Sequence, residues 1–101
     1  MTGGVIHVVL VRWGASTTPD RIERIRETVL SLGAKIPGIE SIAEGPSISP
    51  EGLERGYDYG FVIDFESREA RDRYLPHEDH LPLAKELGEA SDAVLVYDLP
   101  G

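Results

Sequence analysis

The apolar positions near the N-terminus are almost continuous. We predict a strand from Val5 to Trp13, with Ile6, Val8 and Leu10 on one face and His7 among apolar residues on the other. A sheet with one face in water should instead alternate apolar and polar residues. We therefore expect this strand to be covered on both sides.

The next segment has the spacing of an amphipathic helix. Thr18 is suited to the N-cap and Pro19 to the first helical position, so the helix is expected to begin there. Apolar residues then recur at intervals of three and four and form one stripe. This stripe consists of Ile22, Ile25, Val29 and Leu32. We expect Gly33 to end the helix as a C-terminal cap.

Two strands are predicted in the middle of the chain. Residues 39–44 have a weak strand pattern, whereas residues 58–66 alternate clearly. One face of the second strand carries Tyr59, Phe61, Ile63 and Phe65. The connection, residues 47–57, is long for a hairpin, which makes it a candidate lid or contact loop.

The last third of the chain contains helical segments and a final strand. Ser67 is expected to cap a helix that holds Ala70 and Tyr74 on one face and ends or bends at Pro76. A further short helix around residues 81–87 is expected to close at Gly88, before a nearly continuous apolar strand at residues 93–98.

The resulting order is strand, helix, strand, strand, helix, strand. This is the split βαβ pattern of the ferredoxin-like α+β fold, with a four-stranded antiparallel sheet and the helices on one face. The other face needs water or a partner, and the two-sided first strand favours a partner. We expect a homodimer in which two sheets pack face to face.

Composition narrows the classes of function. A chain of 101 residues fits a single domain, residues 1–101, and its lack of cysteine excludes disulfides and thiolate chemistry. A net charge of −8 disfavours nucleic acid and anionic membrane surfaces. We see no basic leader segment and no apolar stretch near the roughly 20 residues that span a bilayer, so we expect a cytoplasmic protein.

The residues suited to chemistry gather in the segment from Tyr74 to His80. It contains a phenol, two carboxylates and two of the three histidines of the chain. His80 could act as a general base, because a histidine titrates near neutral pH. Tyr74 could donate a hydrogen bond to a substrate oxygen.

The same residues also have purely structural interpretations. His80 could lie in a polar loop, and both Tyr74 and the strand residue His7 could be hydrogen-bonded core residues. His77 and His80 stand three residues apart, as metal ligands can, but no third ligand has a defined spacing. We therefore predict no metal site.

Several short motifs together resemble the stress-responsive dimeric α/β-barrel (Dabb) family. They are His7 in a strand, Ile36-Pro37-Gly38-Ile39, Gly56-Tyr57-Asp58-Tyr59, Asp64-Phe65-Glu66-Ser67, Tyr74 followed by His77 and His80, and Val96-Tyr97-Asp98. The resemblance extends over nearly the whole chain and implies the ferredoxin-like fold and a homodimer.

The resemblance also implies a function for the site. A plant cyclase of this family closes a linear polyketide thioester by an aldol-type reaction without a cofactor. The resemblance implies that His80 is the base, that Tyr74 stands beside it and that His7 is in the same pocket. The pocket would bind a small hydrophobic or polyketide-like molecule and would be lined by Val9, Val11, Tyr59, Phe61, Ile63, Leu75 and Leu83.

This chain departs from the cyclase at several positions. The cyclase has a histidine where this chain has Tyr59. The family often has His-Pro-x-His in the segment that begins at His77, whereas here the acidic pair Glu78 and Asp79 follows that histidine. The cyclase's own substrate should therefore not be carried over. Two alternatives stay open: a non-enzymatic stress-responsive dimer and a cofactor-free monooxygenase.

Overall fold

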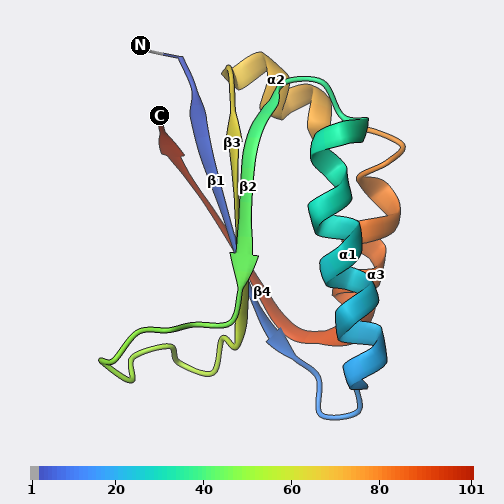
Figure 1. The fold of residues 1–101 in the computed structure, drawn as a ribbon, viewed down its shortest axis with the longest axis vertical. Helices are drawn as coiled ribbons and strands as arrows, with labels where there is room; N and C mark the ends of the chain where they lie inside the picture. Colours follow the sequence, from blue (N-terminus) through green and yellow to red (C-terminus); the bar gives the residue numbers. More distant parts are fainter. Residues whose placement is uncertain (1–2) are drawn as a thin grey trace.

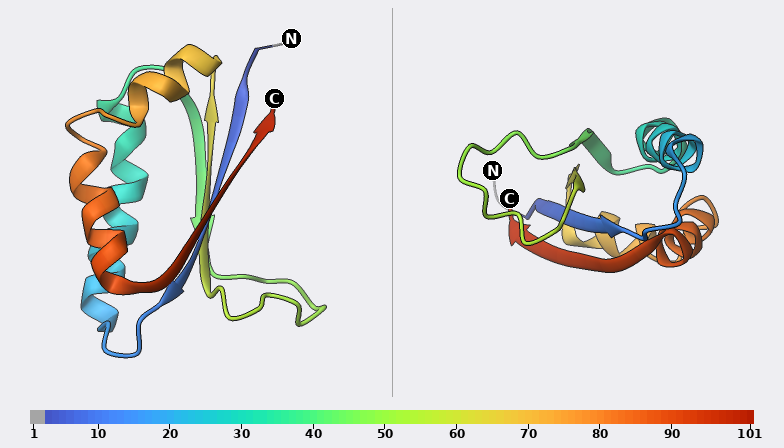
Figure 2. Two further views of the ribbon diagram at one scale, coloured as in Figure 1. Left: turned by 180° about the vertical axis from the view of Figure 1, so that it is seen from behind. Right: turned by 90° about the horizontal axis from the view of Figure 1, so that it is seen from below.

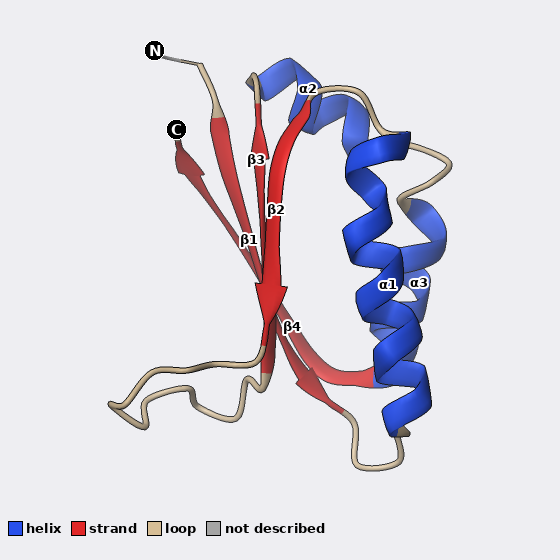
Figure 3. Ribbon diagram, in the orientation of Figure 1, coloured by secondary structure: helices blue, strands red, loops and turns tan. Residues whose placement is uncertain are grey.

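In the computed structural model, which describes residues 3–101, four strands form one antiparallel sheet in the order β2-β3-β1-β4 (Figure 1). The strands are β1 (Val5–Trp13), β2 (Ile39–Gly45), β3 (Tyr59–Phe65) and β4 (Ser91–Pro100). The helices are α1 (Pro19–Lys35), α2 (Arg68–Tyr74) and α3 (Leu81–Ala90). All of them lie on the same side of the sheet (Figures 2 and 3). The predicted α+β, ferredoxin-like fold is thus confirmed.

Helix α1 begins where the sequence predicts but ends later. The Thr18 hydroxyl accepts a hydrogen bond from the Arg21 N–H, as an N-cap should. The prediction that Gly33 caps the C-terminus is wrong, since the helix continues to Lys35. A Cβ on Gly33 would stand at an ordinary van der Waals distance, 3.8 Å, from methyl groups of Ile39 and Ile42, so the helix packs on β2 at this position.

Helices α2 and α3 follow β3 with only a short linker between them. The Ser67 hydroxyl caps α2 by accepting from the Ala70 N–H at 3.0 Å. The prediction that Gly88 closes α3 is wrong, because the helix runs on to Ala90. Leu87 and Ala90 are both buried, so the apolar face of the helix extends past the glycine.

The two faces of the sheet have different surroundings. On the helix side, every second residue of β1 is buried, from Val5 through His7 to Val11. On the opposite face, called the open face below, Val8 is half-buried and stands between Val62 of β3 and Tyr97 of β4. The other large apolar residues of this face are Ile6, Leu10, Leu95 and Leu99. The single chain leaves this apolar face uncovered.

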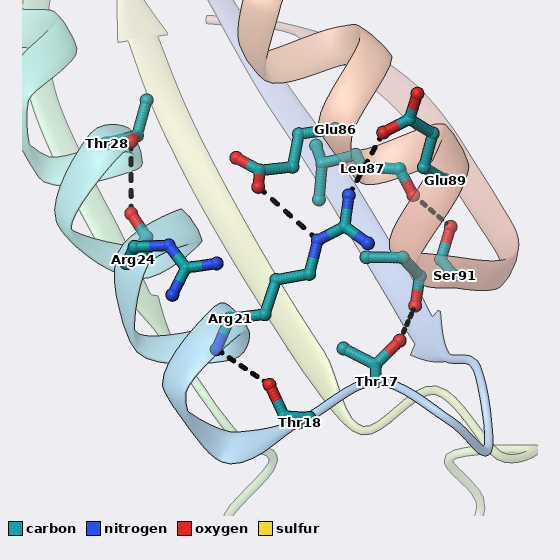
Figure 4. A network of polar contacts seen from close by, with 10 residues as sticks. Thr17, Thr18, Arg21, Arg24, Thr28, Glu86, Leu87, Glu89 and Ser91 are labelled. Carbon is teal, nitrogen blue, oxygen red and sulfur yellow. Dashed lines mark hydrogen bonds and ion pairs between the residues drawn. The ribbon is translucent and has the colours of Figure 1, made fainter.

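A polar network fixes the C-terminal end of α3 against α1 and β4 (Figure 4). Arg21 of α1 donates to Glu86 at 3.4 Å and to Glu89 at 3.0 Å. The Thr17 hydroxyl donates to the Ala90 carbonyl, and the Ser91 hydroxyl donates to the Leu87 carbonyl, both at 2.5 Å. These contacts hold α3 in an orientation in which the helix face opposite this network points towards the sheet. Across residues 3–101, no helix has the length and apolar character needed to cross a membrane.

Candidate functional site

A cavity of about 180 Å³ lies between the sheet and the α2–α3 segment. It is lined by His7, Val9, Phe61, Tyr74, Leu75, His80, Ala84, Leu87, Val94 and Val96. Most of this lining is hydrocarbon, and its polar side chains are the three predicted catalytic residues. The fold thus brings His7, Tyr74 and His80 together from β1, the end of α2 and the start of α3.

Tyr74 carries a hydroxyl that has no hydrogen-bond acceptor within residues 3–101. Its side chain is fully buried, and its hydroxyl makes no hydrogen bond with any described residue. Burial raises the pKa of this hydroxyl above its ordinary value of about 10, so the group stays protonated. A buried hydroxyl without a hydrogen-bond partner is costly.

His80 offers a basic nitrogen on a ring that lies beside the Tyr74 ring. Its Nδ1 lies 2.9 Å from the Leu75 carbonyl oxygen, which can only accept, so Nδ1 carries the proton and Nε2 of the neutral ring has a free lone pair. Burial lowers the pKa of His80 below 6.5, although the bond to Leu75 acts in the opposite direction. The imidazole is therefore neutral at pH 7. Its ring centroid is 4.1 Å from that of Tyr74.

His7 is held by a chain of charged groups that reaches the protein surface. Its Nδ1 lies 2.7 Å from Asp98 Oδ1, and the second oxygen of Asp98 accepts from Arg71 at 2.5 Å. The His7 ring meets the Tyr74 ring edge to face, with centroids 5.6 Å apart. Because Asp98 accepts from Nδ1, Nε2 is left as the nitrogen available for other contacts.

The sequence did not single out Asp98 and Arg71 as functional residues. Asp98 lies in the quoted motif Val96-Tyr97-Asp98, but only the pairing of β4 with β1 brings it opposite His7. Arg71 reaches the pair because it lies one helical turn before the tyrosine of α2. No signal in the sequence alone links these three positions, since 91 residues separate His7 from Asp98.

The predicted lining residues fall into two groups. Val9, Phe61 and Leu75 line the cavity. Four others are buried elsewhere in the core and are not among its lining residues: Val11, Tyr59, Ile63 and Leu83. The remaining lining residues, Ala84, Leu87, Val94 and Val96, were not predicted, although the helical spacing of the first two and the apolar run of the last two were visible.

Tyr59 belongs to a separate polar cluster. Its hydroxyl donates to Glu44 Oε1 at 3.0 Å, and Glu44 is also held by two bonds from Arg26, at 2.8 and 3.1 Å. The Arg26 guanidinium holds the pKa of the Glu44 carboxyl below its usual value. The ring of Tyr59 stacks on Trp13 with centroids 5.3 Å apart. These contacts tie α1 to the β2 edge of the sheet.

The third histidine, His77, hydrogen-bonds within its own loop. His77 Nδ1 accepts a hydrogen bond from the Asp79 N–H at 3.0 Å. In the part of the chain that the structure describes, no three histidine or acidic side chains are arranged to hold a metal ion. The histidine pair of the linker therefore separates into His80, which faces the cavity, and His77, which does not line it.

Comparison with known proteins identifies the family of this chain. The model of the stress responsive A/B barrel domain (Dabb) matches residues 5–100. The chain belongs to the Dabb family. The stress-response A/B barrel domain-containing protein HS1 of Arabidopsis thaliana is 32% identical over 96 residues, which are 95% of this chain and 88% of that protein.

Solved structures share this Dabb fold over nearly their whole length. A dimeric ferredoxin-like protein of unknown function from Jannaschia is 28% identical with a TM-score of 0.87, covering 96% of this chain and 98% of that one. A hydroxynitrile lyase of Passiflora edulis has a TM-score of 0.92 at 19% identity, covering 100% and 95%. The Jannaschia structure and two further ones are described as dimeric.

Proposed function

We propose that this protein is a homodimeric small-molecule-binding enzyme that transfers protons at a carbon next to a carbonyl group. One observation carries the proposal. Tyr74, whose buried hydroxyl has no acceptor among the described residues, and His80, whose Nε2 has a free lone pair, both line the same small, mostly apolar cavity. A hydrogen-bond donor and a base that line one cavity are the two groups that enolisation of a carbonyl compound requires.

The proposed step uses side chains alone. The carbonyl oxygen of the substrate accepts a hydrogen bond from the Tyr74 hydroxyl. Nε2 of His80 takes a proton from the adjacent carbon, and the electron pair of the broken C–H bond moves to the oxygen as an enolate. The enolate then attacks a second carbonyl carbon to form a carbon–carbon bond, or the reverse reaction breaks one. The protonated His80 returns its proton to the new oxyanion or leaving carbon.

The lining limits what the cavity can accept. A volume of about 180 Å³ is close to that of apolar cavities of ~150 Å³ that hold one benzene ring. No lysine or arginine lines it, so nothing there compensates the charge of a carboxylate. We therefore propose a neutral carbonyl compound of about one ring. A polyketide-like chain would place only its reacting end inside, with the remainder over the exposed Leu75, Val94 and Val96.

The uncovered sheet face supports the homodimeric part of the proposal. Large apolar side chains occupy the open face, and Tyr97 of its edge strand β4 is 61% exposed. Exposed apolar patches of this kind typically mark protein–protein interfaces. Similar structures are dimeric, and a second copy of the same sheet offers a matching apolar surface.

The ligand preference can be tested by calorimetric titration with three one-ring probes. We expect acetophenone to bind more tightly than toluene, which cannot accept from Tyr74, and benzoate not to bind. In Tyr74→Phe, the affinity for acetophenone should fall about fivefold, to the level of toluene, because one hydrogen bond of roughly 1 kcal/mol is lost. Absence of binding by all three probes, or an unchanged acetophenone affinity in the variant, would refute this assignment.

The two alternatives differ from this proposal in the step after binding. A non-enzymatic carrier would bind the probes without exchanging their protons. A cofactor-free oxygenase would begin with the same proton removal by His80 but would then consume oxygen, which an oxygen electrode measures during incubation with a phenolic substrate. Neither alternative explains better why an unpaired donor and a neutral base share the cavity.

A further inference from the structure

The connection between β2 and β3, residues 46–58, extends from the sheet towards the side that carries no helices (Figures 1 and 2). This segment is called the arm below. It is mostly polar, but it presents two large apolar side chains to solvent. Ile48 is 95% exposed and Leu53 is 58% exposed. Such side chains at the end of a long projection are unexplained by the packing of a single chain.

Hydrogen bonds give the arm a defined shape. The Ser47 hydroxyl donates to Glu54 at 2.5 Å, closing the arm across its base, and the Tyr57 N–H donates to the Glu54 carbonyl at 3.0 Å. Asp58 joins the arm to the sheet, since its N–H donates to the Val11 carbonyl and its carboxylate accepts from the Trp13 N–H. The arm therefore has a defined conformation, unlike a flexible linker.

The turn that leads back to the sheet depends on a glycine. Gly56 has a φ of +86°, which favours glycine, and a Cβ there would stand 3.0 Å from the Arg12 side chain. The stem of Arg12, on the open face, therefore lies directly against the arm. This contact fixes the direction in which the arm leaves the sheet.

A hollow of about 290 Å³ lies where the arm meets the sheet. It is lined by Leu10, Gly45, Pro46, Ser47, Glu54, Tyr57, Tyr59 and Gly60. Leu10 and Gly60 are partners in the β1–β3 register and belong to the open face. The hollow is therefore continuous with the surface that the proposed homodimer covers.

We propose that the arm packs on a second copy of this chain. In the dimer, Ile48 and Leu53 are buried against the partner subunit, and apolar side chains of the partner fill the hollow beneath the arm. Because a two-fold interface is reciprocal, each subunit extends one arm and receives one. A different protein is disfavoured as the occupant, since it would have to enter the hollow beside an open face that the partner sheet already covers. This inference rests on the proposed homodimer.

Thiol reactivity tests the burial of the arm, because the chain contains no cysteine. Ile48→Cys and Glu51→Cys each introduce one thiol into the arm, and Glu51 is exposed and carries no large apolar group. In the dimer, we expect Ile48→Cys to react with Ellman's reagent at least tenfold more slowly than Glu51→Cys. In a Val8→Glu background, or on dilution to monomer, the two rates should become equal.

Sedimentation of the same samples separates the two proposals. A dimer in which both thiols react equally fast would overturn the arm while leaving the sheet-to-sheet dimer intact. A chain that sediments as a monomer at every concentration would overturn both. Ile48→Asp provides an independent measurement, since it should raise the dimer dissociation constant at least tenfold, whereas Glu51→Lys should not.

Discussion

At the scale of single residues, the Tyr74 hydroxyl creates a conflict between stability and binding. The group is buried and has no acceptor among the described residues, which costs about 1–3 kcal/mol relative to a satisfied hydroxyl. Tyr74→Phe removes the polar atom and keeps the ring. We expect the free energy of unfolding, measured in urea, to rise by about 1 kcal/mol while ligand affinity falls. A loss of more than about 1 kcal/mol would mean that the hydroxyl has a partner in the folded protein.

His80 gives the protein a pH-dependent term in its stability. Burial lowers the pKa of the folded imidazole below 6.5, so the unfolded chain binds more protons in acid. The stabilisation is therefore complete above pH 6.5 and decreases as the pH falls through the folded pKa. Replacing His80 with glutamine should reduce the loss of unfolding free energy between pH 7 and pH 5. His77→Gln is the matched control, and an equal effect of both substitutions would contradict the assignment.

The sequence identified the candidate catalytic residues better than the residues that hold them in position. His7, Tyr74 and His80 were identifiable because imidazoles and a phenol are rare and carry chemistry, and the family resemblance joined them. Asp98 and Arg71 are charged residues of a common kind, and their role depends on strand register and helix phase. Which apolar residues line the cavity was equally hidden, because a buried valine looks the same whether it faces a cavity or a neighbour.

At the scale of elements, Gly38 determines how closely α2 approaches the start of β2. It has a φ of +92°, and a Cβ there would stand 2.5 Å from the Cβ of Ala70. We expect Gly38→Ala to destabilise the fold by about 2–3 kcal/mol, through backbone strain and overpacking together. Gly52→Ala is the control, since Gly52 has a φ of +72° with nothing within 4 Å of the new Cβ. Equal urea midpoints for the two variants would contradict this explanation.

Element ends were predicted less well than element positions. Both helices that were expected to stop at glycine continue beyond it, α1 to Lys35 and α3 to Ala90. A glycine inside a helix costs about 0.5–1 kcal/mol, whereas burying a large apolar side chain contributes about 1.5–3 kcal/mol. Just beyond the two glycines, Ile36 at the C-cap of α1 and Ala90 at the end of α3 are both buried, so burial outweighs the cost of the glycine here. Local propensity alone does not include that tertiary contribution.

At the scale of the whole molecule, the open face should decide the assembly state. Val8 lies at its centre, between Val62 and Tyr97, so Val8→Glu would bury an unpaired charge in a face-to-face dimer. We expect this variant to be a monomer by sedimentation at concentrations where the unmodified protein is a dimer. Leu30→Glu, an equal change on the exposed surface of α1, should leave the dimer intact. A Val8→Glu dimer would place the interface elsewhere.

The apolar character of both faces of β1 is the sequence feature from which we predicted a sheet-to-sheet dimer. What the sequence did not contain is the direction of the arm, because Gly56 and Arg12 approach each other only in the folded chain. The two proposed roles, ligand binding and subunit contact, therefore belong to opposite sides of the sheet. The cavity lies on the side of the sheet that carries the helices, and the arm extends towards the other side, where we propose that the second subunit packs (Figure 2).

The central claim is that the cavity removes protons from carbon, and deuterium exchange measures this directly. Acetophenone is incubated with the protein in D2O, and loss of the methyl proton signal is followed by NMR. We predict exchange well above the buffer rate, reduced about 100-fold or more in His80→Gln and strongly in Tyr74→Phe, but unchanged in His77→Gln. Exchange at the buffer rate with the unmodified protein, or equal rates in His80→Gln and His77→Gln, would contradict the claim.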